Sequence, residues 1–409
     1  MNIFLKAPQQ KISCAITLEG SKSISNRLLI LRAMSEKYFA ITNLSPGDDT
    51  EAMLRILGSH EMLQDVGAAG TTMRFLTSYF ASKEGERILT GSERMKKRPI
   101  GILVEALQNL GADISYLDKE GYPPLKIKGK KLAGGKIQIK SDVSSQFLSS
   151  LLMVAPKLEK GLEMHLIGKI ASLPYLLMTL KLMQALGAKY EMHGNVIKVL
   201  PGNYSANDMQ VESDWSAASY YFSICALQKN AEIKIKGLFE KSLQGDSVLP
   251  EIYKQLGVES NFDGSVLTLK QKNTFTNFFE FDFSDCPDLA QTVVITCAGL
   301  GIPGKFHGLE SLKIKETDRT QALALELKKF KVDFTADVDN STWSLNGKTV
   351  SDSGKKIKTY EDHRMAMAFT PLSLVHENIV IEDAEVVKKS YPSFWDDLSR
   401  LGFSCVSVG

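Results

Sequence analysis

The stretch LQNLGADISY (residues 107–116) carries the pattern that decides the fold. An apolar-periodic helix ends at Leu110-Gly111, because glycine takes the left-handed conformation that closes a helix, and residues of alternating polarity then leave it as a strand. The pattern recurs in LRILGSHEM (54–62), MQALGAKYEM (183–192), YKQLGVESNF (253–262), LSRLGFSCVS (398–407) and, without glycine, LKKFKVDFTA (327–336). The sequence therefore predicts a repeated helix-to-strand unit.

The spacing of these helix ends supports a repeat of about 70 residues used six times. The stops at Gly58, Gly111, Gly187, Gly257, Lys331 and Gly402 lie 53, 76, 70, 74 and 71 residues apart. Each unit is long enough for two strand-and-helix pairs plus a hairpin, so three units would make one domain and six would make two. The short first interval predicts that one unit is trimmed. Chance spacing of common Leu-Gly stops is the alternative.

Composition narrows the class of protein. The chain of 409 residues is 44% hydrophobic and 23% charged, which is typical of a globular protein of about two domains. Its 49 basic and 47 acidic residues give no bulk positive field for a nucleic acid, so any preference for anions must be local.

Targeting and metal signals are weak. The N-terminus has no signal-peptide pattern, no apolar run is long enough to span a bilayer, and five scattered cysteines favour a reducing compartment. We therefore expect a cytoplasmic protein. The histidines and cysteines form no metal-ligand pattern.

Four stretches in the first half combine polar or basic residues with a predicted helix start. They are GSKSISNR (20–27), VGAAGTTMRFL (66–76), RMKKRPIG (94–101) and SDVSSQF (141–147). Free backbone amides and the dipole of a helix N-terminus favour anions, and Arg and Lys side chains add charge. Ordinary capping and solvated charge runs are the alternative.

Three further stretches in the second half carry ionisable residues next to helix starts: CPDLAQT (286–292), KETDR (315–319) and TYEDHRMAMAF (359–369). Asp288, Lys315 and Glu316 would form a proton-shuttling set if the fold brings them together. GLGIPGKF (299–306) matches a glycine-rich phosphate loop only superficially, since it follows a helix-like run, and we interpret it as a helix-to-strand turn.

Taken in this order, the motifs closely resemble the enolpyruvyl transferase family, through GSKSISNR, RMKKRPIG, SSQF, PDLAQT, KETDR and DHRMAMA. The resemblance implies an α/β fold of two lobes, each of three βαβαββ units, with the first unit trimmed. It places one lobe at residues 21–236, and the other at residues 1–20 plus 237–409. The lobes of this family close on substrate.

The resemblance also implies the ligands and their residues. It implies transfer of the enolpyruvyl group of phosphoenolpyruvate to the 5-hydroxyl of shikimate 3-phosphate, with release of phosphate. Residues expected at shikimate 3-phosphate are Lys22, Ser23, Arg27, Ser144, Ser145, Gln146, Ser172 and Tyr175. Those expected at phosphoenolpyruvate are Lys22, Gly70, Thr71, Arg98, Gln146, Arg319, Arg364 and Lys389.

The same resemblance gives the chemistry and the assembly. Asp288 and Lys315 are expected to handle the hydroxyl proton and Glu316 the carbon proton, by addition and elimination, without a metal or organic cofactor. A cytoplasmic monomer that binds neither nucleic acid nor membrane is expected. The donor pocket of the family also accepts glyphosate.

One departure leaves alternatives open. The family loop GNAGT carries asparagine where this chain has Ala68, although Gly70, Thr71 and Arg74 remain. A weak or silent paralogue that binds a phosphorylated ligand is one alternative. A transferase that uses a UDP-amino sugar is another, but it typically needs a cysteine that residues 67–99 lack.

Overall fold

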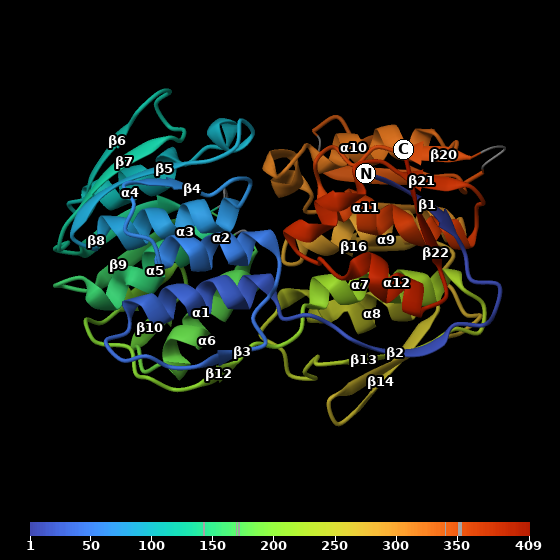
Figure 1. The fold of residues 1–409 in the computed structure, drawn as a ribbon, viewed down its shortest axis with the longest axis horizontal. Helices are drawn as coiled ribbons and strands as arrows, with labels where there is room; N and C mark the ends of the chain where they lie inside the picture. The colour runs from blue at the N-terminus through green and yellow to red at the C-terminus, as the bar shows by residue number, and fades with distance from the viewer. Residues whose placement is uncertain (142–143, 169, 171, 340, 351–353) are drawn as a thin grey trace. The chain divides into compact units, whose positions relative to one another are not determined.

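The structure, a computed structural model, describes residues 1–141, 144–168, 170, 172–339, 341–350 and 354–409 (Figure 1). They form two compact units: a continuous unit, Ser21–Val211, and a split unit, Met1–Gly20 with Glu212–Gly409. We expected the second crossing between units after Lys236, but the division falls after Val211. The reason is that β13 (Glu232–Lys236) pairs in parallel with β2 (Ser13–Thr17) and so belongs to the split unit.

The split unit contains three four-stranded sheets of one design. In each, two parallel neighbours are followed by two antiparallel strands. The first has the order β14 (Val258–Asp263), β15 (Val266–Gln271), β13, β2. The second is β16 (Phe279–Asp282), β17 (Gly304–His307), β19 (Thr342–Asn346), β18 (Asp333–Ala336). The third is β20 (Lys355–Ile357), β21 (Ile379–Ile381), β1 (Asn2–Lys6), β22 (Ser404–Val408), so the N-terminal strand completes the last unit.

The continuous unit repeats this design twice and shortens it once. Its complete sheets are β4 (Leu63–Asp65), β5 (Gly85–Thr90), β7 (Leu125–Gly129), β6 (Asp113–Tyr116) and β10 (Tyr190–His193), β11 (Val196–Val199), β9 (Leu162–Ile167), β8 (Gly135–Lys140). The third has only the parallel pair β3 (Ile41–Thr42) and β12 (Met209–Gln210).

The trimmed first unit is therefore confirmed. Every residue from Gly58 to β4 is described, and no hairpin lies between them, whereas a hairpin follows the helix stop in the next units. Gly111, Gly187, Gly257 and Gly402 have the expected positive φ, and Lys331 adopts φ +59° without being glycine. At Gly58 the expectation of a left-handed residue is wrong: its φ is −88°. Gly58 instead continues the right-handed turn of α2, since its amide donates to the Leu54 carbonyl at 3.2 Å and the Ser59 amide donates to the Ile56 carbonyl at 3.1 Å.

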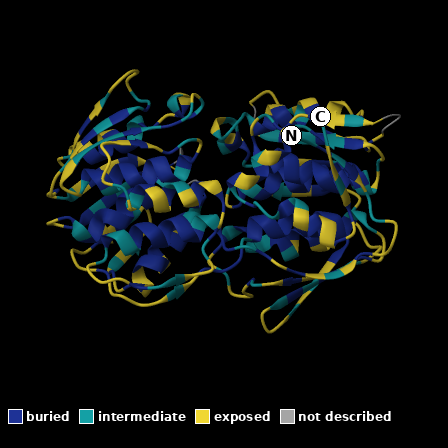
Figure 2. Ribbon diagram, in the orientation of Figure 1, coloured by how far each residue is buried: buried dark blue, intermediate teal, exposed yellow. Residues whose placement is uncertain are grey.

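Helices fill the interior of each unit (Figure 2). Those of the continuous unit are α1 (Lys22–Met34), α2 (Asp48–Leu57), α3 (Gly70–Ala81), α4 (Gly101–Asn109), α5 (Ser145–Val154) and α6 (Leu173–Ala185), with 3₁₀ turns η1 (Met95–Lys97) and η2 (Ala155–Lys157). Those of the split unit are α7 (Trp215–Leu227), α8 (Leu249–Gln255), α9 (Ala290–Leu300), α10 (Arg319–Lys328), α11 (His363–Phe369) and α12 (Phe394–Arg400). Its 3₁₀ turns are η3 (Gly245–Val248), η4 (Pro287–Leu289), η5 (Glu310–Ile314), η6 (Thr370–Leu374) and η7 (Ala384–Lys389).

The first helix of every βαβαββ unit lies at the centre. In the continuous unit α1, α3 and α5 contact one another, and in the split unit α9 contacts both α7 and α11. Hydroxyls tie some of these helices together: the Ser219 and Thr292 hydroxyls lie 3.2 Å apart, and Thr296 donates to Ser223 at 2.7 Å. Each unit has its own apolar core, so the helix N-termini within a unit are held by a rigid interior.

Two smaller findings complete the fold. GLGIPGKF is the expected helix-to-strand turn, since α9 ends at Leu300, Gly301 has φ +75° and β17 begins at Gly304. Over the described part of the chain, none of the helices combines the length and the apolar character that crossing a bilayer requires.

Candidate active site

Five of the seven sequence motifs lie at or just before the first residues of central helices, whereas RMKKRPIG leads into α4 and KETDR leads into α10. Lys22 begins α1, Gly70 and Thr71 begin α3, and Ser144 caps α5 by accepting from the Gln146 amide. In the split unit Asp288 lies in η4, the short turn that leads into α9, and Arg364 is the second residue of α11. This placement follows from the repeat, because equivalent helices present equivalent ends, and each end offers backbone amides to anions.

The helix starts of α3 and α5 meet in the continuous unit. Gln146 Nε2 donates to Thr71 Oγ1 at 3.2 Å, so the predicted SSQF and AGTT motifs form one surface. Ser145 is almost fully buried beside this contact. Ser172 lies at the start of α6 with φ +55°, a conformation that costs a residue other than glycine free energy and is frequent at functional sites.

Gly70 lies against two guanidinium groups. A Cβ on Gly70 would lie 2.5 Å from Arg98 Nη1 and 2.6 Å from Arg74 Nη1, and Arg74 Nη1 donates to the Gly70 carbonyl at 2.8 Å. A side chain at this position would displace the guanidinium groups, so glycine is what lets them lie this close to the backbone. Arg98 is 7% exposed, and its Nε has no hydrogen-bond partner among the described residues. Two adjacent cations at a helix start make a site suited to a small anion.

Arg27 and Lys22 are held firmly in the same unit. Arg27 Nε donates to Thr179 Oγ1 at 2.7 Å and Nη1 to the Ser23 carbonyl at 2.8 Å, while Nη2 reaches Ser149 Oγ at 3.2 Å and the Tyr175 carbonyl at 3.4 Å. Burial lowers the pKa of Arg27 to about 10, so it stays charged at neutral pH. Lys22 Nζ lies 3.1 Å from Asp49 Oδ2.

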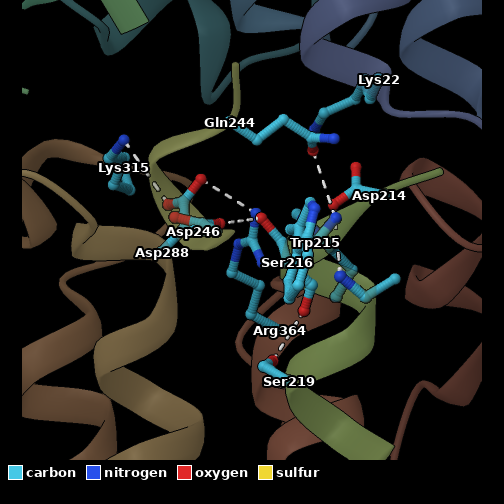
Figure 3. A network of polar contacts seen from close by, with 12 residues as sticks. Lys22, Asp214, Trp215, Ser216, Ser219, Gln244, Asp246, Asp288, Lys315 and Arg364 are labelled. Carbon is cyan, nitrogen blue, oxygen red and sulfur yellow. Dashed lines mark hydrogen bonds and ion pairs between the residues drawn. The ribbon is translucent and has the colours of Figure 1, made fainter. Parts of the chain in front are cut away.

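Asp288 is the centre of the charged cluster in the split unit (Figure 3). Its Oδ1 accepts from Arg319 Nη1 at 2.9 Å and lies 3.8 Å from Lys315 Nζ. Its Oδ2 accepts from Arg364 Nη2 at 2.9 Å. The fold therefore brings together residues that are 27 to 76 positions apart in the chain.

Arg319 and Lys389 join the remaining carboxylates to this cluster. Arg319 Nη2 lies 2.9 Å from Glu316 Oε2, and its Nε lies 2.7 Å from Asp362 Oδ2. Lys389 Nζ lies 2.8 Å from the other Glu316 oxygen. Four cationic side chains (Lys315, Arg319, Arg364 and Lys389) thus contact three carboxylates (Asp288, Glu316 and Asp362), and the excess of positive charge favours an anionic ligand.

The cluster shifts the protonation equilibria of its members. Burial alone would raise the pKa of Asp288, but Arg364, Lys315 and Arg319 outweigh it and hold that pKa far below the ordinary range. Burial lowers the pKa of Lys315, although Asp288 opposes the shift. Burial also disfavours charge on Arg319, but Asp362, Glu316 and Asp288 raise its pKa above the ordinary value. Asp288 is thus a fixed anion, and Lys315 is a base that loses its proton more easily than an ordinary lysine.

A second carboxyl, that of Asp246, lies near Asp288. Asp246 is 2% exposed and its Oδ2 accepts from Ser216 at the start of α7 (Figure 3). Burial, together with the neighbouring negative charge of Asp288, raises the pKa of Asp246 to about 7. This carboxyl is therefore partly protonated near neutral pH, unlike Asp288.

The structure also contains contacts that the sequence analysis misses. The sequence motifs predict no role for Asp362, Asp49, Asp246 or Tyr220. The Tyr220 hydroxyl lies 3.5 Å from Arg364 Nη1. Asp362 stands beside a residue of the predicted site, and its helix-start position could have suggested a cap but not the ion pair with Arg319. Asp49, Asp246 and Tyr220 had no signal that separates them from ordinary polar or core residues.

Comparisons with known proteins agree with this arrangement. The sequence model of EPSP synthase (3-phosphoshikimate 1-carboxyvinyltransferase) matches residues 6–62 and 58–398. A Bacteroides fragilis protein named 3-phosphoshikimate 1-carboxyvinyltransferase is 47% identical over 411 residues and covers 100% of both chains. An Aliivibrio fischeri protein of the same name is 35% identical over 423 residues, covering 96% of this chain and 98% of its own.

A solved structure shows the same fold. The EPSP synthase from Acinetobacter baumannii superposes with a TM-score of 0.80 over 100% of both chains at 22% sequence identity, which supports the two-lobed architecture. The solved structure shows the fold alone, whereas the family model and the full-length relatives show the family. The chain belongs to the EPSP synthase family.

Proposed function

We propose that this chain transfers the enolpyruvyl group of phosphoenolpyruvate to the 5-hydroxyl of shikimate 3-phosphate and releases phosphate. The observation that carries the proposal is the Asp288 cluster, in which the three expected proton-transfer residues lie with three expected donor-binding cations. Full-length relatives that carry the name of this reaction support it.

Phosphoenolpyruvate is a compact anion, and we assign it to the cationic groups. Arg319, Arg364 and Lys389 are the candidates in the split unit. Arg98, Lys22, Gly70, Thr71 and Gln146 are those of the continuous unit. A guanidinium group can hold a carboxylate or a phosphate through two parallel hydrogen bonds, and we assign such a contact to Arg98, whose buried Nε has no partner among the residues that the structure describes.

Shikimate 3-phosphate offers hydroxyls, a carboxylate and a phosphate, and we assign it to the helix starts of α1, α5 and α6. The candidates are Lys22, Ser23, Arg27, Ser144, Ser145, Gln146, Ser172 and Tyr175. The four hydrogen bonds of Arg27 use its Nε, one N–H of Nη1 and both N–H groups of Nη2. Within the described ranges the second Nη1 proton has no hydrogen-bond partner, and we assign it to the ligand.

The proposed chemistry is an addition followed by an elimination. In the addition, the 5-hydroxyl oxygen bonds to C2 of phosphoenolpyruvate, its proton passes to Lys315 or Asp288, and Glu316 gives a proton to C3. In the elimination, C3 returns a proton, the C2=C3 double bond re-forms and phosphate leaves with the electrons of its C–O bond. Lys315 suits the hydroxyl proton, since a base with a lowered pKa is more often unprotonated near neutral pH.

The charge state of Asp288 gives it a different role from Lys315. A carboxylate whose pKa is held far below the ordinary range is a weak base, so it accepts a proton poorly. We propose that Asp288 mainly orients the acceptor hydroxyl and keeps Arg364 and Arg319 in place, while Lys315 takes the proton. Glu316, bridged by Arg319 and Lys389, is held in one position for its transfer to C3.

The two alternatives have less support. The relatives at 47% and 35% identity are named for the shikimate ester and not for a UDP-amino sugar. A silent paralogue has no need of the retained proton-transfer set. We further propose that the enzyme is cytoplasmic and monomeric. Size-exclusion chromatography with light scattering of the purified protein would test the monomeric state.

The decisive experiment measures phosphate release by the purified protein with phosphoenolpyruvate and one acceptor at a time. Release with shikimate 3-phosphate and not with the UDP-amino sugar supports the proposal. Release only with the sugar would replace it with the sister reaction. A folded protein that binds the shikimate ester and releases nothing would identify a silent paralogue.

A further inference from the structure

The segment that leads into Arg364 contains an unusual turn. The amide of Asp362 donates to the Thr359 carbonyl at 3.0 Å, and the two central residues, Tyr360 and Glu361, have φ values of +54° and +58°. Two consecutive positive φ angles are typical of a type I′ turn, which strongly prefers glycine, asparagine or aspartate at these positions. Tyrosine and glutamate are strained there, so neighbouring contacts must hold the turn.

Glu326 supplies these contacts at the start of the turn. This carboxylate, on α10, has a relative exposure of 0%. Its Oε1 accepts from the Tyr360 hydroxyl at 2.8 Å, and its Oε2 accepts from the Lys358 amide at 3.2 Å and from Lys329 Nζ at 2.6 Å. Burial and the adjacent Glu326 raise the pKa of Tyr360, so its hydroxyl remains a donor. A buried anion with three donors is well compensated, so it can fix the groups that bind it.

The end of the turn is fixed to the same helix. Asp362 accepts from Arg319 Nε at 2.7 Å, and Arg319 lies seven residues before Glu326 in α10. Residues seven apart lie two turns along one face of a helix. The turn is therefore attached to α10 at both ends, by Glu326 at Lys358 and Tyr360 and by Arg319 at Asp362.

The fixed turn determines the position of Arg364. Asp362 Oδ1 accepts from the Arg364 amide at 2.8 Å and so caps α11, and the Arg364 side chain reaches Asp288. If the turn relaxed toward negative φ angles, Asp362 and the first turn of α11 would move together. The Arg364 guanidinium group would then move away from its position beside Asp288.

We propose that Glu326 is a positioning residue that holds the strained turn Thr359–Asp362 and thereby places Arg364 for phosphoenolpyruvate. This inference rests on the proposed function, because it assumes that Arg364 binds that substrate. Glu326 itself is fully buried, so we expect it to act through the turn and not by direct contact with a substrate. Its effect is expected on the donor and not on shikimate 3-phosphate, which distinguishes positioning from general stabilisation.

The test uses the full-length enzyme with four substitutions. Glu326→Gln keeps the size of the side chain, but its amide end can no longer accept a hydrogen bond where the carboxylate accepted one. Tyr360→Phe removes one donor and keeps the buried charge. Leu325→Gln, at a half-exposed neighbouring position of α10, is the control for the helix. Glu361→Gly, at an exposed position, removes the strain at one of the two residues with positive φ.

Steady-state kinetics should show a selective effect. We expect Glu326→Gln to raise KM for phosphoenolpyruvate about tenfold, with KM for shikimate 3-phosphate within about twofold of wild type, and Tyr360→Phe to act in the same direction. Adding Glu361→Gly to Glu326→Gln should recover at least half of the loss. Leu325→Gln should behave as wild type. An unchanged donor KM in both Glu326→Gln and Tyr360→Phe, or an equal rise in both KM values, would overturn the proposal.

A measurement without substrates separates this proposal from the proposed function. Hydrogen exchange followed by mass spectrometry should show faster exchange for a peptide covering residues 358–366 in Glu326→Gln than in wild type, and partial reversal by Glu361→Gly. Equal exchange in the two proteins contradicts the positioning role even if the enzyme is active. Wild-type protein that releases no phosphate contradicts the proposed function and leaves the exchange result valid for the turn.

Discussion

Arg364 and Asp288 form an ion pair, with Nη2 2.9 Å from Oδ2, although one residue lies in the first turn of α11 and the other precedes α9. The other Asp288 oxygen, Oδ1, accepts from Arg319 Nη1 and lies 3.8 Å from Lys315 Nζ. Loss of Arg364 therefore leaves Asp288 with two cationic neighbours. We therefore expect the fold to tolerate loss of the pair, which sets where the Arg364 guanidinium lies, and this expectation leads to the first prediction.

Arg364→Ala should remove nearly all activity and leave the fold intact. A guanidinium group that binds a substrate anion contributes about 2–5 kcal/mol, so kcat/KM for phosphoenolpyruvate should fall by a factor of about 30 to several thousand. Thermal unfolding should move by only a few degrees, because the apolar core is untouched. Arg400→Ala, which removes an exposed surface cation, is the matched control and should have normal kinetics. Near-normal kinetics for Arg364→Ala would exclude it from the donor site.

The pH dependence of the rate should report Lys315. Burial lowers its pKa, so the protonated form is lost at a pH below the ordinary lysine range. Unprotonated Lys315 is the form that takes the hydroxyl proton in the addition, so kcat should rise as pH rises through this lowered pKa. Lys315→Arg keeps its charge at all these pH values, and it should be slower overall and lack this rise.

Two comparisons complete the Lys315 experiment. Lys315→Met should be nearly inactive at every pH, because neither charge nor base remains. Lys313→Arg, on the preceding turn η5, serves as a control for adding arginine in this segment. A rise with pH of the same shape in wild type and Lys315→Arg would assign the titration to another group.

The sequence predicts the repeat well because its signal is local. Helix periodicity, the Leu-Gly stops and their spacing indicate six units, and the missing hairpin after Gly58 follows from one short interval. The boundary near residue 236 could not be predicted from such signals. The pairing of β13 with β2, more than 200 residues away in the chain, decides it, and periodicity contains no information on pairing.

The candidate site likewise contains residues that the sequence predicts and residues that only the structure reveals. The motifs contain Asp288, Lys315, Glu316 and Arg319, because chemistry restricts the residue types, and their meeting in one cluster is observed in the structure. Asp246 and Glu326 escape prediction. Each is a single carboxyl in an ordinary helical or turn context. Burial by segments distant in the chain makes Asp246 hard to ionise and lets Glu326 hold a strained turn.

Asp246→Asn should change how stability depends on pH. The native carboxyl keeps its proton up to about pH 7, whereas an unfolded aspartate ionises near pH 4. Between these values the native state binds more protons, so this group's contribution to stability is complete below about pH 4 and falls as pH rises, by at most about 1.4 kcal/mol per pH unit. The asparagine variant lacks this loss. Relative to wild type it should gain up to about 3 kcal/mol between pH 5 and 7.

Urea unfolding at pH 5, 6, 7 and 8 measures this effect. Asp285→Asn, an exposed aspartate three residues before Asp288, is the control and should follow the wild-type curve. The difference between Asp246→Asn and wild type should level off above pH 7, where the native carboxyl has ionised. A constant difference across the whole range would show that Asp246 does not titrate in this window.

Ala68 provides the last prediction, because it occupies an exposed position in the loop before α3 where the family carries asparagine. The loop keeps its backbone geometry, with Gly67 at φ +58° and its amide bonded to Asp65 Oδ1 at 2.7 Å. An asparagine can therefore be introduced without repacking. A hydrogen bond from its amide to the charged donor is worth about 1.5–3 kcal/mol, so Ala68→Asn should lower KM for phosphoenolpyruvate by about tenfold or more.

Glyphosate gives an independent measure of the same loop. We expect it to inhibit the wild-type enzyme competitively with phosphoenolpyruvate, since the family's donor pocket accepts this anion, and Ala68→Asn should lower its inhibition constant in parallel with the donor KM. Ala68→Leu, similar in size but without an amide, should produce neither gain. If asparagine and leucine gave the same kinetics, the loop would lie outside the donor site, and the donor would have to be bound in this unit by the remaining candidates Lys22, Arg98 and Gln146.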